Sequence, residues 1–269
     1  MKKIISLIMI AVMLLSLAAC QKKDSGEDDS LKYIQDKGKL ILGLDDSFPP
    51  MGFRDENNQI VGFDIDLAKA VCEKLGVELE LQPISWEAKE QELNTKNIDC
   101  IWNGLSNTPE RQKSMTMSIP YMSSNISLVV VNGSGIDSME DMAGKKLALQ
   151  SGSAAEETLN NDENKDFKAS LAEEVPFDDY ETAMMDLESA NSDAILMDSV
   201  MANYKITEGG KNFVVLDETL FEDQYAIGFR KSDLALCEAV NNALKELKKD
   251  GTIEEISTKW FGSDITIIQ

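Results

Sequence analysis

Residues 98–111 have the sequence "IDCIWNGLSNTPER", in which an apolar run is followed by a polar loop. The run 98–101 predicts a buried strand, because short apolar runs bounded by turn residues are typical of strands in a core. Gly104 and small polar residues follow, and then Pro109 and Arg111. Ligands of open α/β sheets bind beyond the carboxyl ends of strands, so this loop is a candidate ligand site.

Strand and helix patterns alternate on both sides of this stretch. Strands are expected at 39–44, 77–84 and 98–103, and helices at 63–76 and 86–96. The pattern then restarts, with strands at 126–131, 146–150, 193–197, 213–216 and 225–230 and helices at 153–160, 180–190, 233–249 and 251–260. This alternation predicts an α/β fold with mostly parallel sheets, helices on their faces and two αβ halves.

A short segment of similar sequence occurs in each half. The segments "NIDCI" (97–101) and "NSDAI" (191–195) each follow a predicted helix and open a predicted strand. One strand leads to the polar residues 103–106 and the other to Asp198 and Ser199. If the two sheets face each other, both polar clusters lie at one cleft.

Charge and composition exclude several classes of function. The chain has 269 residues, with 26 basic and 48 acidic side chains and a net charge of −22. A strongly acidic protein offers no counter-charge to phosphates, so we expect no nucleic-acid partner. Histidine is absent, which removes catalysis by Ser-His-Asp or Cys-His sets and the commonest zinc ligand. We expect no metal, no cofactor and no catalytic residue.

The N-terminus predicts export and lipid anchoring. Two lysines precede an apolar run at 4–17, which is too short to span a membrane, so residues 1–19 are predicted to be a signal peptide. The segment "LAAC" (17–20) resembles a bacterial lipobox, which would make Cys20 the lipidated N-terminus. The alternative is an ordinary signal peptide that contains a cysteine. Removing two lysines and no acid changes the charge from −22 to −24. The polar segment through residue 30 is expected to be a flexible tether.

Lipidation of Cys20 would leave Cys72, Cys100 and Cys237. The patterns around Cys72 and Cys100 predict small core residues. Whether any of the three forms a disulfide stays open.

Five segments together resemble the extracellular solute-binding proteins of ABC transporters for polar amino acids. They are "SFPPMGFRDENNQIVGFDIDLAKAV" (47–71), "NGLSNTPER" (103–111), "LQSGSAAEE" (149–157), "DAILMDS" (193–199) and "TKWFG" (258–262). The resemblance implies a monomeric, two-lobed Venus-flytrap fold with two hinge strands. Lobe 1 would hold residues 31–122 and 223–269, and lobe 2 would hold 123–222.

The resemblance also implies a role for Arg111, which would pair in a bidentate manner with the α-carboxylate of an amino acid. A guanidinium fork fits a carboxylate and stays charged at any physiological pH. The helix start at "TPER" (108–111) is expected to aim free backbone N–H groups at the same anion. The alternative is a surface arginine that pairs with Glu110 or Asp99.

The family resemblance places the other end of the ligand on lobe 2. The Asp198 carboxylate would bind the α-ammonium group, although the same residue could simply be a helix N-cap. The Gly104 carbonyl and the Ser106 hydroxyl would complete this shell, and Asn103 of the same polar cluster is also a predicted ligand-binding residue. Three further contacts with the carboxylate are implied for the Ser106 N–H group, Ser153 and the backbone of Ala154.

Aromatic positions are expected to enclose the side chain of the ligand. Phe48 and Trp86 match the walls of the family pocket, where an aromatic face packs aliphatic stems or a cation. The alternative for both is a simple core position, which is also our expectation for Trp102. Asp45 matches a position that can reach the tip of a basic side chain.

The resemblance implies that the protein captures an amino acid and delivers it to a membrane permease. Two alternatives stay open, namely a dehydratase-type enzyme on the same scaffold and a ligand-sensing subunit of a receptor. Such an enzyme would need a general acid in the cleft beyond Asp45 and Asp198.

Overall fold

The computed structural model describes residues 28–269. The predicted signal peptide, Cys20 and the tether through residue 27 lie outside this range. Helix α2 (Ser30–Lys37) begins at the last residue of the expected tether, and its first residue is buried. The Asp28 carboxylate accepts a hydrogen bond from the Ser30 N–H group at 2.9 Å. Helix α2 therefore includes the last residue of the segment that the composition predicted to be a tether.

The first sheet has five strands in the order β5-β1-β6-β13-β7. Their bounds are β1 Lys39–Leu44, β5 Glu78–Pro83, β6 Cys100–Ile101, β7 Thr116–Met117 and β13 Gly228–Phe229. Strand β1 pairs in parallel with β5 and β6, whereas β13 runs antiparallel to β6 and β7. The strand predicted at 98–103 is shorter than expected, because after Ile101 the chain leaves the sheet for the polar loop.

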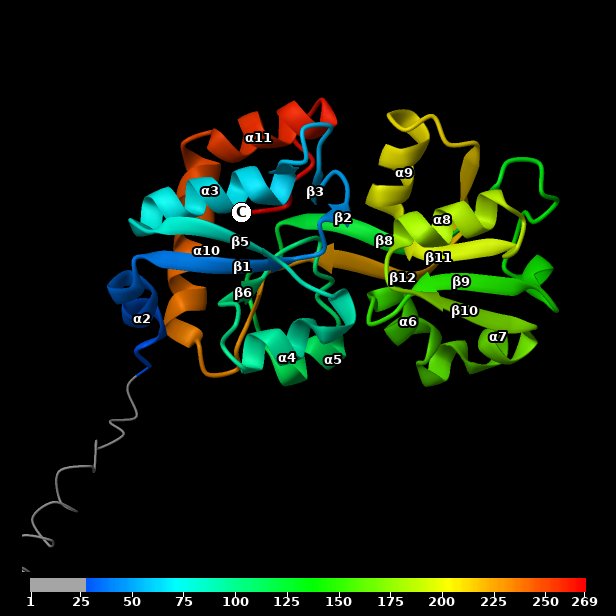
Figure 1. Cartoon of the computed structure of the whole chain (residues 1–269), viewed down its shortest axis with the longest axis horizontal. Coiled ribbons are helices and arrows are strands. Elements are labelled where there is room, and N and C mark those ends of the chain that lie inside the picture. The colour runs from blue at the N-terminus through cyan, green and yellow to red at the C-terminus, as the bar shows by residue number, and fades with distance from the viewer. Residues whose placement is uncertain (1–27) are drawn as a thin grey trace, which may run out of the picture.

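Helices cover both faces of this sheet, with α3 and α11 on one side and α4 and α5 on the other (Figure 1). The bounds are α3 Phe63–Leu75, α4 Lys89–Asn94, α5 Pro109–Ser114, α10 Leu234–Lys249 and α11 Thr252–Phe261, and a 3₁₀ turn η2 spans Trp86–Ala88. Helix α3 buries Ala68, Val71 and Cys72 at helical spacing and ends at Gly76, whose φ of 71° suits a residue without Cβ. We call this sheet and its helices lobe 1.

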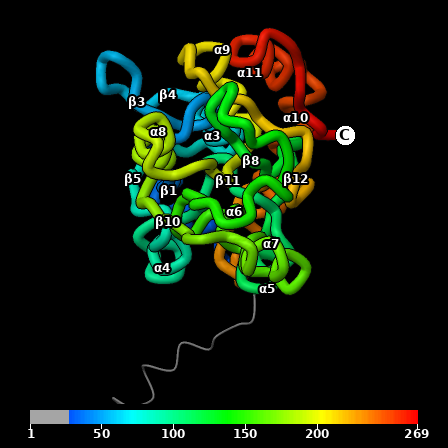
Figure 2. The backbone as a smooth tube through the Cα atoms, turned by 90° about the vertical axis from the view of Figure 1, so that its right-hand side faces the viewer, coloured from blue at the N-terminus to red at the C-terminus, as the bar shows by residue number. Residues whose placement is uncertain are grey.

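The second sheet has the order β10-β9-β11-β8-β12 and, with its helices, forms lobe 2. The strands are β8 Met122–Val131, β9 Lys146–Gln150, β10 Glu173–Phe177, β11 Ala194–Asp198 and β12 Phe213–Tyr225. The helices are α6 Ala154–Leu159, α7 Lys165–Ser170, α8 Tyr180–Glu188 and α9 Ser199–Thr207, with 3₁₀ turns η3 Glu140–Met142 and η4 Asp162–Asn164. Viewed from the end of lobe 2, α8 and α9 lie on one side of the sheet and α6 and α7 on the other (Figure 2).

Two long strands join the lobes. Strands β8 and β12 pair in antiparallel register from Met122 opposite Tyr225 to Val131 opposite Phe213, with two irregularities. The strand predicted at 213–216 is only the first part of β12, and the one predicted at 225–230 contains β13 and the last residue of β12. The polar residues between them belong to β12, because backbone pairing with β8 does not require apolar side chains on a partly exposed strand. A small sheet, β2 (Ser47–Phe48), β3 (Gly52–Arg54) and β4 (Ile60–Val61), adjoins lobe 1.

One buried apolar cluster runs through both lobes, and smaller ones lie beside it. Trp102 is a fully buried core residue, as predicted. The three cysteines in the described part of the chain are buried free thiols. Among residues 28–269, no helix combines the length and the apolar character needed to cross a bilayer. The same residues contain no cluster of three or more acidic or cysteine side chains suited to a metal.

Candidate functional site

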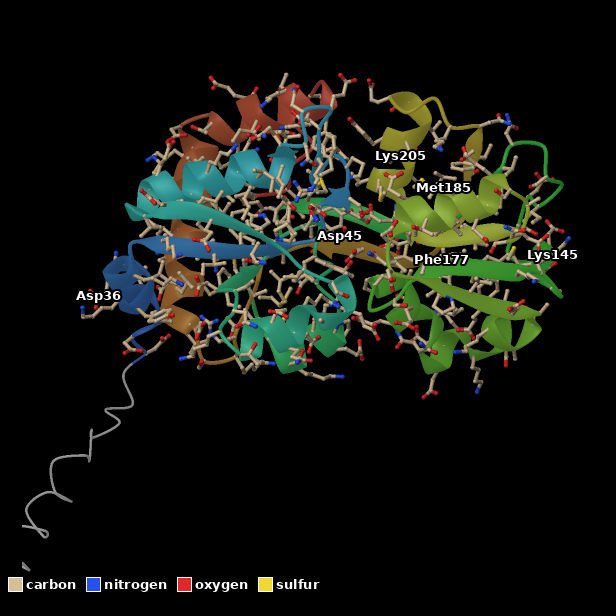
Figure 3. The ribbon with its side chains drawn as sticks, in the orientation of Figure 1. Asp36, Asp45, Lys145, Phe177, Met185 and Lys205 are labelled. Carbon is tan, nitrogen blue, oxygen red and sulfur yellow. The ribbon has the colours of Figure 1, made fainter. Side chains whose placement is uncertain are left out.

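A small cavity lies between the lobes. It is lined by Asp45, Phe48, Trp86, Asn103, Gly104, Ser106, Arg111, Ile126, Gln150, Ser153, Ala154, Tyr180 and Asp198. The structure thus brings all ten residues named from the sequence to one cavity. The sequence analysis missed three lining residues, Ile126, Gln150 and Tyr180. Figure 3 shows Asp45 at the boundary between the two lobes.

Most lining residues follow the carboxyl end of a strand. Asp45 comes directly after β1, and the loop with Gly104 and Ser106 comes after β6. In lobe 2, Gln150 ends β9 and Asp198 ends β11. Since the two sheets turn these ends toward each other, residues from distant segments meet at one place, as the rule for open α/β sheets predicts. The same rule could have identified Gln150, which ends a correctly predicted strand.

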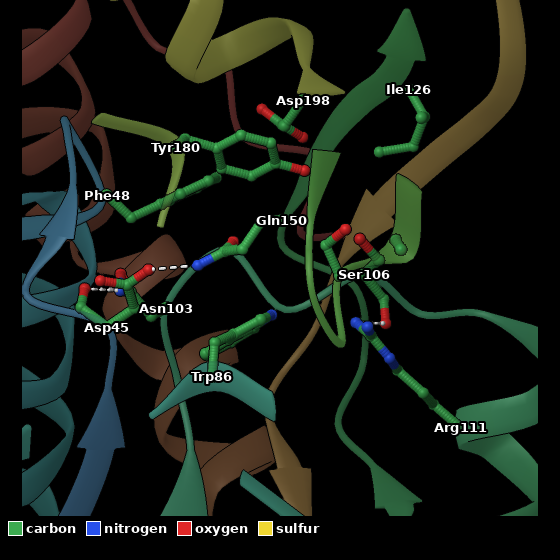
Figure 4. A pocket seen from close by; sticks show the side chains of 13 residues that line it. Asp45, Phe48, Trp86, Asn103, Ser106, Arg111, Ile126, Gln150, Tyr180 and Asp198 are labelled. Atoms are coloured by element: carbon green, nitrogen blue, oxygen red, sulfur yellow. Dashed lines mark hydrogen bonds between the residues drawn. The ribbon is translucent and has the colours of Figure 1, made fainter. Parts of the chain in front are cut away.

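Arg111 is buried in the seam between the lobes, with 1% of its surface exposed. Its Nε donates to Glu157 Oε1 at 2.9 Å, and its Nη2 lies 2.8 Å from the same oxygen. Its Nη1 donates to the Ser106 carbonyl oxygen at 3.3 Å (Figure 4). Arg111 therefore contacts a carboxylate of the other lobe.

Neither partner that the sequence offered for a surface Arg111 is used. The Asp99 carboxylate accepts a hydrogen bond from Lys37 Nζ at 2.5 Å, and Glu110 lies 3.5 Å from Lys113 Nζ. The surface interpretation of Arg111 is therefore wrong, and the side chain faces the cavity instead.

The start of helix α5 does not serve the cavity as the sequence suggested. Pro109, its first residue, has no N–H group, and the Arg111 N–H group donates to the Thr108 hydroxyl oxygen at 3.2 Å. Residues 107–110 are not among those that line the cavity. The expected set of free N–H groups aimed at an anion is therefore not formed here.

Asp198 is a helix N-cap, as one interpretation of the sequence had it, and it also lines the cavity. It is the N-cap of α9, since its Oδ1 accepts from the N–H groups of Val200 at 2.8 Å and Met201 at 3.2 Å. Its Oδ2 accepts a hydrogen bond from the Ser124 hydroxyl at 2.5 Å. Burial raises the pKa of this carboxyl, although these donors oppose the shift. The same carboxylate lines the cavity, on the side opposite Arg111 (Figure 4).

Asp45 occupies another part of the cavity wall. Its Oδ1 accepts from the Ser47 N–H group at 2.9 Å and from the Ser47 hydroxyl at 2.6 Å. Its Oδ2 accepts from Gln150 Nε2 at 2.7 Å, a contact between the lobes (Figure 4). Burial also raises the pKa of Asp45. The backbone carbonyl of the same residue accepts from Asn103 Nδ2.

Apolar faces form much of the remaining lining. Phe48 and Trp86 are each 7% exposed, and both also belong to buried apolar clusters. Both residues are therefore core residues that also line the cavity. The ring centroids of Phe48 and Tyr180, which come from different lobes, lie 6.2 Å apart with an interplanar angle of 46°. Aromatic faces at this position can pack against an aliphatic stem or a cation.

Gly104 permits the close approach of the loop to the cavity wall. Its φ is 59°, and a Cβ atom at this position would come within 2.8 Å of the Phe48 ring. Its N–H group donates to the buried Asp64 carboxylate at 2.7 Å, and the Tyr121 hydroxyl donates to the same oxygen at 2.9 Å. Burial raises the pKa of Asp64 to about 7.

The turn from lobe 2 brings Ser153 and Ala154 to the cavity. Ser153 is the N-cap of α6, because its hydroxyl oxygen accepts from the Glu156 N–H group at 3.2 Å. Ala154 is the first residue of that helix. The Ser153 hydroxyl is thus engaged in capping, while the side chains of both residues remain in the lining.

Comparison with known proteins places this architecture in a family. The L-cystine-binding protein TcyJ of Escherichia coli is 31% identical over 96% of this chain and 96% of its own length. The arginine-binding extracellular protein ArtP of Bacillus subtilis is 32% identical over 97% of this chain and 98% of its own length. An ABC uptake transporter substrate-binding protein from Streptococcus pneumoniae, solved with bound histidine, is 38% identical with a TM-score of 0.85, over 90% of this chain and 99% of that one.

The family model for this group of proteins matches residues 40–263, which include most of both lobes and every residue that lines the cavity. The chain belongs to the bacterial extracellular solute-binding proteins, family 3.

Proposed function

We propose that this protein captures an L-α-amino acid between its lobes and delivers it to the permease of an ABC transporter. The observation that carries the proposal is the placement of a guanidinium and a carboxylate, Arg111 and Asp198, on opposite sides of one interlobe cavity. An α-amino acid has complementary charges at its two ends. The relatives named above are described as binding cystine, arginine and histidine, which supports this class of ligand.

The lining suggests how the common part of an amino acid would be held. The α-carboxylate would take the Nη1–Nη2 edge of the Arg111 guanidinium, whose present contacts with two backbone carbonyls are long, at 3.3 and 3.4 Å. The Ser106 and Ala154 N–H groups and Ser153 would complete its contacts. The α-ammonium would meet Asp198, the Gly104 carbonyl and the Ser106 hydroxyl. Because the two lobes supply different parts of this shell, a ligand would stabilise the closed form through contacts that only that form completes.

Charge around the cavity favours a ligand with a cationic side chain. Arg111 is already paired with Glu157, so the carboxylates of Asp45 and Asp198 lack a cationic side chain among their hydrogen-bonding partners in the described chain. Burial raises the pKa of both, which means that a nearby positive charge would relieve an unfavourable desolvation. An amino acid of net charge +1 has two cationic groups, its α-ammonium and its side chain. These match the two carboxylates, Asp198 and Asp45.

Thermal unfolding of the purified protein tests this assignment. L-arginine, L-lysine and L-histidine would be compared with L-glutamine, L-cystine and L-glutamate. A ligand that binds only the native state raises its stability by about 4 kcal/mol at a thousandfold excess over Kd. We expect the largest shift from a cationic amino acid. If none of the six shifts the midpoint, the proposed function is wrong; if only L-cystine or L-glutamine does, the charge argument is wrong.

Delivery and anchoring are separate parts of the proposal. Cys20 lies outside the described residues, and its lipidation is supported by the lipobox-like segment alone. We propose a lipid-anchored monomer in which lobe 1 holds residues 31–122 and 223–269 and lobe 2 holds 123–222. Uptake of radiolabelled L-arginine by cells with and without this protein tests delivery, and equal uptake would favour a sensing role.

Closure is proposed to occur at the crossing strands, near Ser123–Ser124 and Phe221–Gln224. This position is supported by the pairing of β8 with β12 through these residues and by the ligand-site residues on both sides of it. X-ray scattering should give a smaller radius of gyration once a bound amino acid is present. An unchanged radius at saturation would contradict closure.

We propose no catalytic step. The acids that line the cavity accept hydrogen bonds from Ser47 and Gln150 or from the start of α9, which suits charge complementarity better than proton donation. Incubation with prephenate or arogenate tests a dehydratase activity, and formation of product would overturn this assignment.

A further inference from the structure

Glu157 has no assigned role, although its carboxylate contacts two residues of the other lobe. It lies in α6 of lobe 2 and is not among the residues that line the cavity. Its Oε1 accepts from Arg111 Nε at 2.9 Å, and its Oε2 accepts from the Thr108 hydroxyl at 2.9 Å. Both partners belong to lobe 1, so a single carboxylate spans the seam.

The geometry of the ion pair leaves Arg111 able to bind a second carboxylate. A guanidinium has five N–H donors and two edges that fit a carboxylate. Glu157 occupies the edge formed by Nε and Nη2, while Nη1 reaches the Ser106 carbonyl in the cavity wall. The edge formed by Nη1 and Nη2 is therefore the one that a ligand in the cavity would meet. Glu157 and a ligand carboxylate can use the same arginine without competing for one edge.

Neighbouring contacts of the same seam also link the two lobes. The buried Lys89 Nζ of lobe 1 donates to the Gly152 carbonyl of lobe 2 at 2.6 Å. Arg111 Nη2 approaches the same carbonyl at 3.4 Å. Contacts of this kind exist only while the lobes are together, so their energy counts toward closure and not toward the stability of either lobe.

We propose that Glu157 is a positioning residue that orients the Arg111 guanidinium and latches the lobes around a bound amino acid. This inference rests on the proposed function. The pair is well shielded, since the Arg111 side chain is 2% exposed and that of Glu157 is 26% exposed. Its neutralisation should therefore affect the closed complex more than the ligand-free protein.

A competing role for Glu157 would predict the opposite effect of its removal on ligand binding. If Glu157 were a substitute for the ligand carboxylate in the empty cavity, its removal would free Arg111 and tighten binding. A latch instead forms after capture and opposes release. Its removal should accelerate dissociation and leave association almost unchanged, because affinity differences of this kind are carried mainly by the dissociation rate.

The test compares Glu157→Gln with the wild-type protein and with Glu110→Gln as a matched control. Glu110 lies next to Arg111 in the sequence, is exposed, and pairs with Lys113 instead. L-arginine is the probe, or whichever of L-histidine, L-glutamine and L-cystine binds the wild type more tightly. Stopped-flow fluorescence gives the rates, and thermal unfolding without ligand reports any general loss of stability.

We expect the dissociation rate of Glu157→Gln to rise about tenfold, within the usual range of coupling between sites. The ligand-free melting temperature and the control should stay close to wild type. Unchanged or slower dissociation would overturn the latch, as would acceleration accompanied by an equal loss of ligand-free stability. If no amino acid binds the wild type, the proposed function fails and the latch fails with it, whereas binding by the wild type with unchanged dissociation from Glu157→Gln overturns the latch alone.

Discussion

Replacing Asp198 by asparagine and by alanine separates the two roles of this side chain. Its Oδ1 caps α9 through the N–H groups of Val200 and Met201, while its Oδ2 accepts from the Ser124 hydroxyl. Asparagine keeps an oxygen for the cap and places an N–H donor toward the serine oxygen, so it removes only the charge. Alanine removes the charge and the cap together.

The structure allows the two effects to be given magnitudes. Loss of an N-cap costs about 1 kcal/mol, whereas asparagine and aspartate are nearly equal at this position. In a protein of this size, 1 kcal/mol lowers the melting temperature by about 2–4 °C, so Asp198→Ala should show that fall without ligand and Asp198→Asn should not. Both variants leave the α-ammonium of a bound amino acid unpaired, which costs about 2–5 kcal/mol. The corresponding loss of affinity is about 30-fold or more.

Titration calorimetry with L-arginine and thermal unfolding of the ligand-free variants provide the two measurements. The wild type must bind L-arginine for the comparison to be informative; otherwise the tightest ligand of the panel is used. If Asp198→Asn binds as tightly as the wild type, the aspartate is only a helix cap. The pairing of Asp198 with the α-ammonium would then be refuted.

Four further predictions concern Arg111, Asp45, Asp64 and Cys20. Arg111→Lys should lose at least about tenfold in affinity for the same amino acid, because an ammonium lacks the planar fork that can serve Glu157 and a carboxylate together; near-native affinity by calorimetry would contradict this. Asp45→Asn should reduce the preference for L-arginine over L-glutamine, measured as a ratio of Kd values, and an unchanged ratio would show that Asp45 does not reach the ligand side chain. Asp64→Asn should raise the ligand-free melting temperature more at pH 8 than at pH 5, by at least about 2 °C. The pKa of Asp64 is raised from 3.8 to about 7 in the folded protein, so its contribution to stability is complete below pH 4 and is lost as the pH rises through 7; an equal shift at the two pH values would be inconsistent with this titration. Cys20→Ala should release the protein from membranes with binding intact, as seen by fractionation and calorimetry, and a variant that stays in salt-washed membranes would argue against lipidation.

Local patterns determined much of the secondary structure. Strand β1 and helices α3 and α10 were predicted within a residue or so at each end, because their apolar spacing reflects one buried face. Strand β12 was not, since its pairing with β8 comes from backbone hydrogen bonds that leave no mark in the pattern of a partly exposed strand. The return of the chain to lobe 1 after residue 222 came only from the family resemblance, as periodicity carries no information about which sheet a strand joins.

The residues of the candidate site could also be predicted only in part from the sequence. The sequence by itself named residues such as Gly104 and Asp198, because they follow strands whose carboxyl ends must meet at a cleft. Only the tertiary structure showed that Gln150 bridges to Asp45 and that Glu157 reaches Arg111. These pairs are 105 and 46 residues apart and join different lobes. Such contacts depend on how two folded bodies meet, and no local spacing along the chain encodes that geometry.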